Sequence, residues 1–187
     1  MTQPKLLITS LIITLLTSTL SNGQTVVIET ESTIGSGFRS DIGIITAAHV
    51  IGDHASIRYD DIDLAVIKTD NKGDKHPLGT GEPNFFYDRR MNTNQVAVIE
   101  EEANQWIVNQ EFYPGESGLP VFNNTGQVCG VVLGNAKIGG KWLGRVGILQ
   151  RLRDRISSRE STIQHEIDPT PKPRLKLRQR LRSRFSR

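Results

Sequence analysis

The chain has 187 residues, which is enough for one compact domain with extensions at its ends. With 36% hydrophobic and 23% charged residues, its composition is typical of a folded soluble protein, and its single cysteine, Cys129, excludes a disulfide within the chain. The net charge of +3 hides two unlike parts. Residues 169–187 contain eight of the 23 Lys and Arg residues and no Asp or Glu, which leaves 15 basic and 20 acidic residues in the rest of the chain. A mildly acidic body therefore precedes a strongly basic tail.

The N-terminus has the pattern of a targeting segment. Lys5 precedes an apolar run over residues 6–20, and the small residues Ser21 and Gly23 follow. This pattern is typical of a secretory signal peptide, so the sequence predicts that residues 1–23 are removed after Gly23. The alternative is an uncleaved membrane anchor, although the run is shorter than the roughly 20 residues that span a bilayer. Both interpretations predict an exported protein that is secreted, periplasmic or extracellular, or is held at the membrane by this segment.

The body shows short β-type runs separated by turn residues, and few helical patterns. Val and Ile dominate the runs, and Gly, Asn and Asp lie between them. The predicted strands are residues 25–29, 42–46, 56–59, 64–68, 95–100, 105–109, 119–122, 128–133 and 142–147. The turn-forming residues 123–126 predict a hairpin between two of these strands. Many short strands without intervening helices favour an all-β barrel or sandwich.

A helix is predicted at residues 146–158, close to the end of the body. Ile148, Leu149, Leu152 and Ile156 fall on one face, with charged residues on the opposite face. Three prolines at alternate positions, 169, 171 and 173, then end regular structure.

Three local patterns, in chain order, can carry nucleophilic chemistry. They are TAAHV at residues 46–50, DLAVI at 63–67 and GESGLP at 115–120. A serine hydroxyl needs an imidazole to take its proton, and the imidazole needs a carboxylate to fix its tautomer. Backbone N–H groups must also face the developing oxyanion, and a glycine before the serine permits the turn that aims them. The sequence offers a candidate for each part.

These strings resemble the His, Asp and Ser motifs of trypsin-like serine peptidases, most closely the compact, disulfide-free bacterial and viral members. The resemblance covers about residues 25–158, and residues 35–38 (GSGF) are similar to the stretch before the family's histidine. It implies a chymotrypsin-like fold of two orthogonal β-barrels, the first one shortened, with a C-terminal helix. It also implies Ser117 as nucleophile, His49 as general base and acid, and Asp63 as the orienting carboxylate. The amides of Gly115 and Ser117 would form the oxyanion hole.

The sequence departs from the family pattern at three places. Leu119 stands where a second glycine is usual, and Glu116 stands where Asp or Asn is common. Only fourteen positions separate His49 from Asp63, so the first barrel must be reduced to short hairpins. Two neighbouring acids, at positions 60 and 61, lie close enough to replace Asp63, although neither leads directly into the apolar strand.

Substrate preference rests on residues that the resemblance places in the specificity pocket. Glu111, six positions before the serine, would lie at its base and favour Lys or Arg by charge pairing. The alternative is that a shortened loop leaves Glu111 on the surface. Leu133, Gly134 and Asn135 would line the opposite wall, which also fits an apolar pocket for aliphatic side chains.

Other reactive residue types have no matching partners in the sequence. Cys129 lies in an apolar run and is interpreted as a small buried hydrophobe, not as a nucleophile. His54, His76 and His165 lack the spacing of metal ligands and are interpreted as surface residues, so no metal or cofactor is expected.

The predicted function is that of a serine endopeptidase that hydrolyses protein or peptide substrates through an acyl-enzyme. The alternative is an inactive trypsin-like module that binds through its cleft or tail. Residues 159–187 are predicted to be a disordered basic extension, or to bind an anionic surface such as a membrane or a glycan. Nucleic acid is the least favoured partner, because no base-stacking motif is present.

Overall fold

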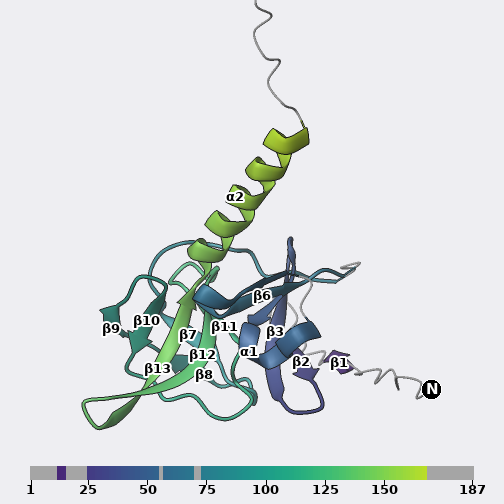
Figure 1. The fold of residues 1–187 in the computed structure, drawn as a ribbon. Helices are drawn as coiled ribbons and strands as arrows, with labels where there is room; N and C mark the ends of the chain where they lie inside the picture. The colour runs from purple at the N-terminus through teal and green to yellow at the C-terminus, as the bar shows by residue number, and fades with distance from the viewer. Residues whose placement is uncertain (1–11, 16–24, 55–56, 70–72, 168–187) are drawn as a thin grey trace, which may run out of the picture. The chain divides into compact units, whose positions relative to one another are not determined.

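A computed structural model of the chain describes residues 12–15, 25–54, 57–69 and 73–167 (Figure 1). The predicted cleavage point after Gly23 lies outside this part, and so do residues 168–187 of the basic extension predicted at 159–187. Both sheets and the beginning of the last helix belong to a compact unit that ends at Asp154, and a second unit begins at Arg155. Among the described residues, no helix combines the length and apolar character that crossing a membrane requires.

The first sheet is antiparallel and has six strands in the order β1-β2-β3-β4-β6-β5. Its strands are β1 (Ile12–Leu15), β2 (Thr25–Glu29), β3 (Ile34–Ser40), β4 (Gly43–Ala47), β5 (Ile57–Tyr59) and β6 (Leu64–Ile67). The short helices α1 (Ala48–Ile51), η1 (Gly52–His54) and η2 (Asp60–Ile62) connect them. Strand β1 lies inside the predicted signal peptide and pairs with β2, so removal of the leader would make β2 the edge strand.

The second sheet is also antiparallel and has seven strands in the order β8-β7-β11-β12-β13-β10-β9. Its strands are β7 (Phe85–Tyr87), β8 (Thr93–Gln95), β9 (Val98–Glu101), β10 (Gln105–Val108), β11 (Pro120–Phe122), β12 (Val128–Ile138) and β13 (Lys141–Ile148). Helix α2 (Leu149–Ile167) follows β13 directly. The protein is therefore mostly β-structure, in two sheets that lie beside each other (Figure 1).

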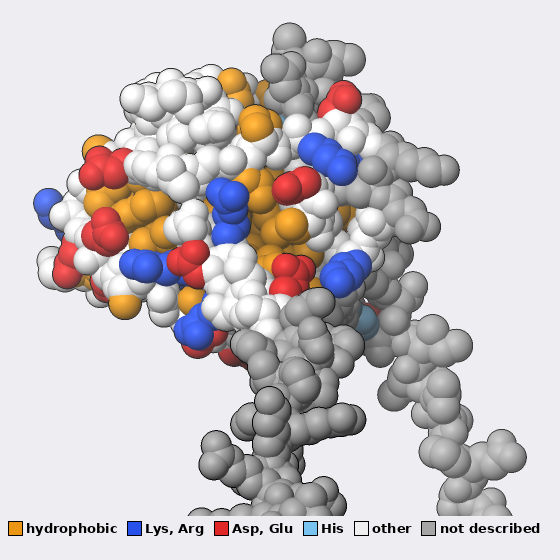
Figure 2. Space-filling model, turned by 90° about the horizontal axis from the view of Figure 1, so that it is seen from above, with side chains coloured by type: hydrophobic (Ala, Val, Ile, Leu, Met, Phe, Trp, Pro, Cys, Tyr) orange, Lys and Arg blue, Asp and Glu red, His pale blue; other side chains and the backbone are white. Residues whose placement is uncertain are grey.

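The sheets are stable because their inward side chains are apolar and close-packed. All residues of β4 and β6 are buried, and β2 alternates between half-buried and buried positions up to its last residue, Glu29, which is exposed. In the second sheet a cluster around Trp106, Val121 and Val146 forms the core. Each large side chain buried in this way contributes about 1.5–3 kcal/mol. On the face seen in Figure 2, acidic and basic side chains are mixed around exposed hydrophobic ones, so no single sign of charge dominates that face.

The structure confirms most of the predicted strands and corrects three points. The run at 95–100 is not one strand, because β8 ends at Gln95 and β9 begins at Val98. Strands β1, β3 and β7 were not predicted as strands. Helix α2 begins at Leu149 because residues 146–148 pair with β12 and so complete β13. It continues to Ile167, so residues 159–167, predicted as part of a disordered extension, are helical. Leu149 and Leu152 of the predicted helical face are fully buried.

Candidate active site

The register between β4 and β6 brings His49 and Asp63 together. Ala47 pairs with Leu64 at the end of this strand pair, so His49 follows one strand and Asp63 precedes the other at the same edge. The backbone N–H of Ala48 donates to the Asp63 carbonyl oxygen at 2.9 Å. Fourteen positions are sufficient because the intervening chain needs to form only the short strand β5 and two helical turns.

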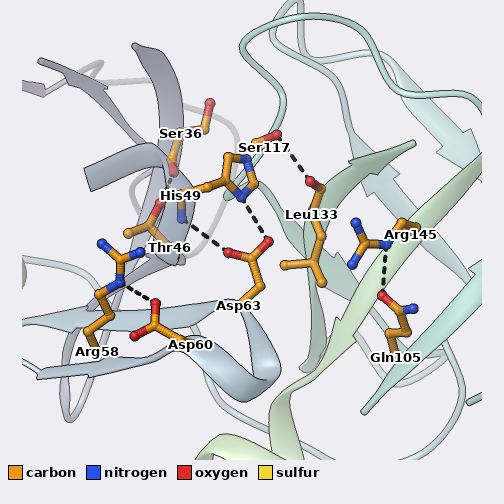
Figure 3. Close-up of polar contacts among 10 residues, drawn as sticks. All are labelled: Ser36, Thr46, His49, Arg58, Asp60, Asp63, Gln105, Ser117, Leu133 and Arg145. Carbon is orange, nitrogen blue, oxygen red and sulfur yellow. Dashed lines mark hydrogen bonds and ion pairs between the residues drawn. The ribbon is translucent and has the colours of Figure 1, made fainter. Parts of the chain in front are cut away.

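The carboxylate of Asp63 contacts His49 through both oxygens. Its Oδ2 lies 2.8 Å from the imidazole Nδ1, and its Oδ1 accepts the His49 backbone N–H at 3.1 Å (Figure 3). Asp63 has φ 50°, in the left-handed region that Asp tolerates better than most residues. The neighbouring acid Asp60 is instead paired with Arg58. With Nδ1 bonded to a carboxylate, Nε2 is the nitrogen that remains for chemistry.

Two consecutive turns shape the loop that carries Ser117. The Glu116 N–H donates to the Tyr113 carbonyl, and the Leu119 N–H donates to the Glu116 carbonyl, both at 3.0 Å. The third position of each turn is a glycine with positive φ, Gly115 (88°) and Gly118 (94°). This is the pattern of type II turns, in which that position requires glycine.

The backbone N–H groups of this loop are hydrogen-bonded except at two residues. Gly118 donates to the Val132 carbonyl at 2.7 Å, in addition to the two turn bonds. Within the described part of the chain, no hydrogen bond uses the amides of Gly115 and Ser117. These two amides are the ones that the sequence assigns to the oxyanion hole, and they are available to an acceptor.

Strand β3 brings the histidine and the serine loop together. A Cβ on Gly35 would lie 2.5 Å from Val50 Cγ1 and 3.1 Å from the Ser117 carbonyl oxygen, so helix α1 and the loop both pack against this one residue. The Ser36 N–H donates to the same carbonyl at 2.7 Å. In Figure 3 the His49 imidazole lies between the Asp63 carboxylate and Ser117.

The Ser117 hydroxyl itself is weakly held. Its Oγ lies 3.5 Å from the Leu133 carbonyl oxygen, at the limit of a hydrogen bond. Among the described residues no hydrogen bond joins it to His49. Catalytic hydrogen bonds are often long in unliganded enzymes and tighten when substrate binds. A Cβ on Gly134 would meet only this Oγ, at 3.7 Å, so there is open space beside the hydroxyl.

The residues predicted for a specificity pocket do not place a carboxylate where it would pair with the Lys or Arg side chain of a substrate. Glu111 is exposed, which is the alternative stated above, because the next residue, Phe112, turns into the core against Gly144. The Asn135 side chain accepts the Phe112 N–H at 2.9 Å and donates to its carbonyl at 2.7 Å. Leu133 is buried. No buried carboxylate therefore lies at position 111 to select Lys or Arg.

Two further expectations concern Cys129 and His76. Cys129 is buried, and burial raises the pKa of its thiol to about 12, which confirms its interpretation as a small hydrophobe. His76 is not a surface residue: it is 4% exposed and packs edge-on against the rings of Phe38 and Phe122. Burial lowers its pKa to about 4, so its ring is neutral near pH 7. The sequence missed this because His76 stands alone among polar residues, with no apolar periodicity.

Glu116 is the buried acid of the serine loop, with 3% of its surface exposed. The pKa of its carboxyl is raised, mainly by burial and further by the charge of Asp88. The Tyr113 N–H bonded to it at 2.8 Å and the charge of Arg89 act in the opposite direction. A Cβ on Gly115 would lie 2.5 Å from Arg89 Nη1, so the guanidinium packs over the loop. Sequence reasoning missed Arg89, because nothing in its local pattern connects it to a loop 26 positions away.

Several cavities adjoin this arrangement, and two of them are lined by Asp63 and by Gly115, respectively. One of about 220 Å³ lies beside the Asp63 side and is lined by Asp61, Glu102, Leu133 and Arg145 among others. The other, about 520 Å³, lies between the β2–β3 connection and the loop and is lined by residues that include Gly115.

Comparison with solved structures identifies the fold. The chain superposes on an astrovirus serine protease, from a human pathogenic astrovirus, with a TM-score of 0.53 and 22% identity, over 66% of this chain and 88% of that one. It also superposes on a serine-to-alanine mutant, in an inactive form, of Rv3671c from Mycobacterium tuberculosis H37Rv, with a TM-score of 0.51 and 17% identity, over 74% of this chain and 87% of that one. No family model and no curated protein sequence matches the chain. The protein therefore has the chymotrypsin-like fold of compact serine proteases.

Proposed function

We propose that this protein is a serine endopeptidase that cleaves protein or peptide substrates through an acyl-enzyme. The observation that carries the proposal is the Asp63–His49 pair opposite a serine loop whose only unused amides are those of Gly115 and Ser117. A carboxylate on Nδ1, a free Nε2 and two open N–H groups are the parts that acyl transfer needs.

In the first step the Ser117 Oγ attacks the carbonyl carbon of the scissile bond, and His49 Nε2 takes the hydroxyl proton. Because the contact of the hydroxyl with Leu133 is long, turning it towards the imidazole costs little. The carbonyl oxygen becomes an oxyanion and accepts the Gly115 and Ser117 N–H groups. Asp63 stabilises the imidazolium that forms.

In the second step His49 returns the proton to the leaving nitrogen, the C–N bond breaks, and the acyl group stays on Ser117. Water then attacks the ester with His49 again as base, which releases the acid and regenerates the hydroxyl. The open space at Gly134, beside Oγ, is where the acyl part of a substrate can lie.

Labelling with a fluorophosphonate probe tests this proposal. The probe reacts only with an activated serine, so we expect labelling of the parent protein and none of Ser117→Ala. A folded parent that labels no better than Ser117→Ala would contradict the proposal and favour an inactive binding module.

We further propose that residues 1–23 export the protein, on the sequence pattern alone. N-terminal sequencing of protein recovered outside the producing cell should begin at Gln24. A chain that still begins at Met1 would favour the uncleaved anchor.

A further inference from the structure

The serine loop is held from the opposite sheet mainly by one residue of β3. The two residues whose amides are free, Gly115 and Ser117, both have their carbonyl oxygens bonded to Ser36. The Ser36 hydroxyl donates to the Gly115 carbonyl at 2.9 Å, and the Ser36 backbone N–H donates to the Ser117 carbonyl at 2.7 Å. Ser36 is 79 positions away from Gly115 in the sequence.

The bond to Gly115 matters because glycine is otherwise free to change conformation. Gly115 has φ 88°, and glycine populates positive and negative φ about equally. A switch to negative φ would turn the Gly115 N–H away from the position of an oxyanion. The peptide group between Gly115 and Glu116 is held at both ends, by the Ser36 hydroxyl on its oxygen and by the Tyr113 carbonyl on its N–H. Fixing this group fixes one side of the Gly115 Cα, so the Gly115 N–H, which belongs to the preceding peptide group, can turn only by rotation about the Gly115 N–Cα bond.

Ser36 is itself held rigidly. It is 1% exposed, and its own carbonyl accepts the Thr46 hydroxyl at 2.6 Å (Figure 3). A Cβ on Gly118 would lie 1.7 Å from that carbonyl oxygen, so β3 and the loop are in direct contact there. A buried hydroxyl in a fixed backbone can hold its acceptor without loss of side-chain entropy at each turnover.

We propose that Ser36 is a positioning residue for the oxyanion hole, whose hydroxyl keeps the Gly115 amide directed at the substrate carbonyl. This role rests on the proposed function and deepens it. Ser36 does not touch substrate; it acts through the peptide group of Gly115. The role predicts that loss of the hydroxyl lowers kcat and leaves KM nearly unchanged, because the oxyanion forms only in the transition state.

The test compares Ser36→Ala with a matched control, Ser40→Ala, in the full chain. Ser40 lies on the same strand, is 0% exposed and donates to a backbone carbonyl, that of Gly43, at 2.8 Å. Each variant therefore loses one hydroxyl–carbonyl bond, and Ser40→Ala also loses the acceptor of the Ile42 N–H at 3.3 Å, but only the Ser36 bond holds the serine loop. The readouts are the melting temperature and the kcat and KM for hydrolysis of p-nitrophenyl acetate.

We expect Ser36→Ala to lower kcat by about 10- to 100-fold with KM within about twofold, less than the 10²–10³-fold cost of removing an oxyanion donor outright. Ser40→Ala should lose at least as much thermal stability and keep its kcat. Ser36→Cys, which replaces the hydroxyl by a weaker donor of similar shape, should have an intermediate kcat and serves if the alanine variant does not fold. The Gly115 amide resonance should broaden or split in Ser36→Ala.

Each contrary outcome is distinct. Equal kcat values for Ser36→Ala and the parent would overturn the positioning role, and so would an equal fall in kcat for Ser36→Ala and Ser40→Ala. A rise in KM with kcat unchanged would place Ser36 in substrate binding and also overturn it. If the parent hydrolyses the ester no faster than Ser117→Ala, the proposed function itself fails, whatever Ser36 does.

Discussion

The two halves of the site are built by different means. The His49–Asp63 half rests on strand register and two side-chain contacts, and its side chains are 46% and 27% exposed. The serine half rests on backbone hydrogen bonds, two glycines with positive φ and the buried side chains of Glu116 and Ser36. In the first half the chemistry lies in the side chains, and in the second half much of it lies in the backbone. Substitutions in the first half should therefore lower activity, and substitutions in the second half should lower both activity and folding stability.

The largest effect on activity is expected in the first half, from Asp63→Asn. The amide keeps the shape but cannot stabilise the imidazolium or fix the same tautomer, so kcat should fall about 10³- to 10⁴-fold while the melting temperature changes little. The rate of fluorophosphonate labelling, which needs the same activated serine, should fall with kcat and is the measurement. Asp60→Asn is the matched control, since Asp60 is paired with Arg58 and not with His49. Equal losses in the two variants would show that Asp63 is not the orienting carboxylate.

The largest effect on stability is expected in the second half, from Gly118→Ala. The new Cβ would meet the Ser36 carbonyl oxygen at 1.7 Å, at a φ of 94°. Overpacking and backbone strain together should cost about 4 kcal/mol of unfolding free energy, measured by urea denaturation.

Gly126→Ala serves as the control for the strain alone. Gly126 has φ 76° and no atom within 4 Å of the added Cβ, so this variant should lose only about 1 kcal/mol. If the two alanine variants lose the same stability, the contact of β3 with the serine loop is not tight.

Lowering the pH should have an effect of intermediate size on the free energy of unfolding. The cause is His76, which lies between the two sheets. The folded pKa of about 4 lies below the ordinary 6.5, so the unfolded chain binds more protons between these values and stability falls as the pH drops from 6.5 to 4. The full shift corresponds to about 3 kcal/mol.

His76→Phe removes this titration and keeps a ring against Phe38 and Phe122. Urea denaturation at several pH values should show that the stability difference between parent and variant changes over this window and is constant above pH 7. A constant difference throughout would mean that His76 is not buried as a neutral ring.

The smallest effect is expected from Glu111→Gln. Glu111 is exposed, and exposed charges contribute little to binding. The preference among peptide substrates at the residue before the scissile bond should therefore change less than about twofold. A peptide-library profile of both proteins measures this. Loss of a strong Lys or Arg preference in the variant would restore Glu111 to the specificity pocket.

Local patterns were sufficient where a single segment defines its own structure. The predicted strand at 25–29 agrees with β2, and 64–68 agrees with β6 to within one residue. Strand β3 was missed because two glycines interrupt its apolar pattern, and it forms because its neighbours β2 and β4 supply the pairing. The predicted helix began three residues early because its apolar face continues the buried face of β13.

The sequence alone determined the kinds of groups at the site and their order along the chain, because a histidine after one apolar strand, an acid before the next and a glycine-framed serine are local patterns. Tertiary structure alone decided which acid meets the imidazole, that Glu111 faces solvent, and that Ser36 bonds the carbonyls of Gly115 and Ser117. The physical reason is that each of these contacts depends on strand register or on the approach of the two sheets. Residues far apart in sequence set that geometry together, and no single segment encodes it.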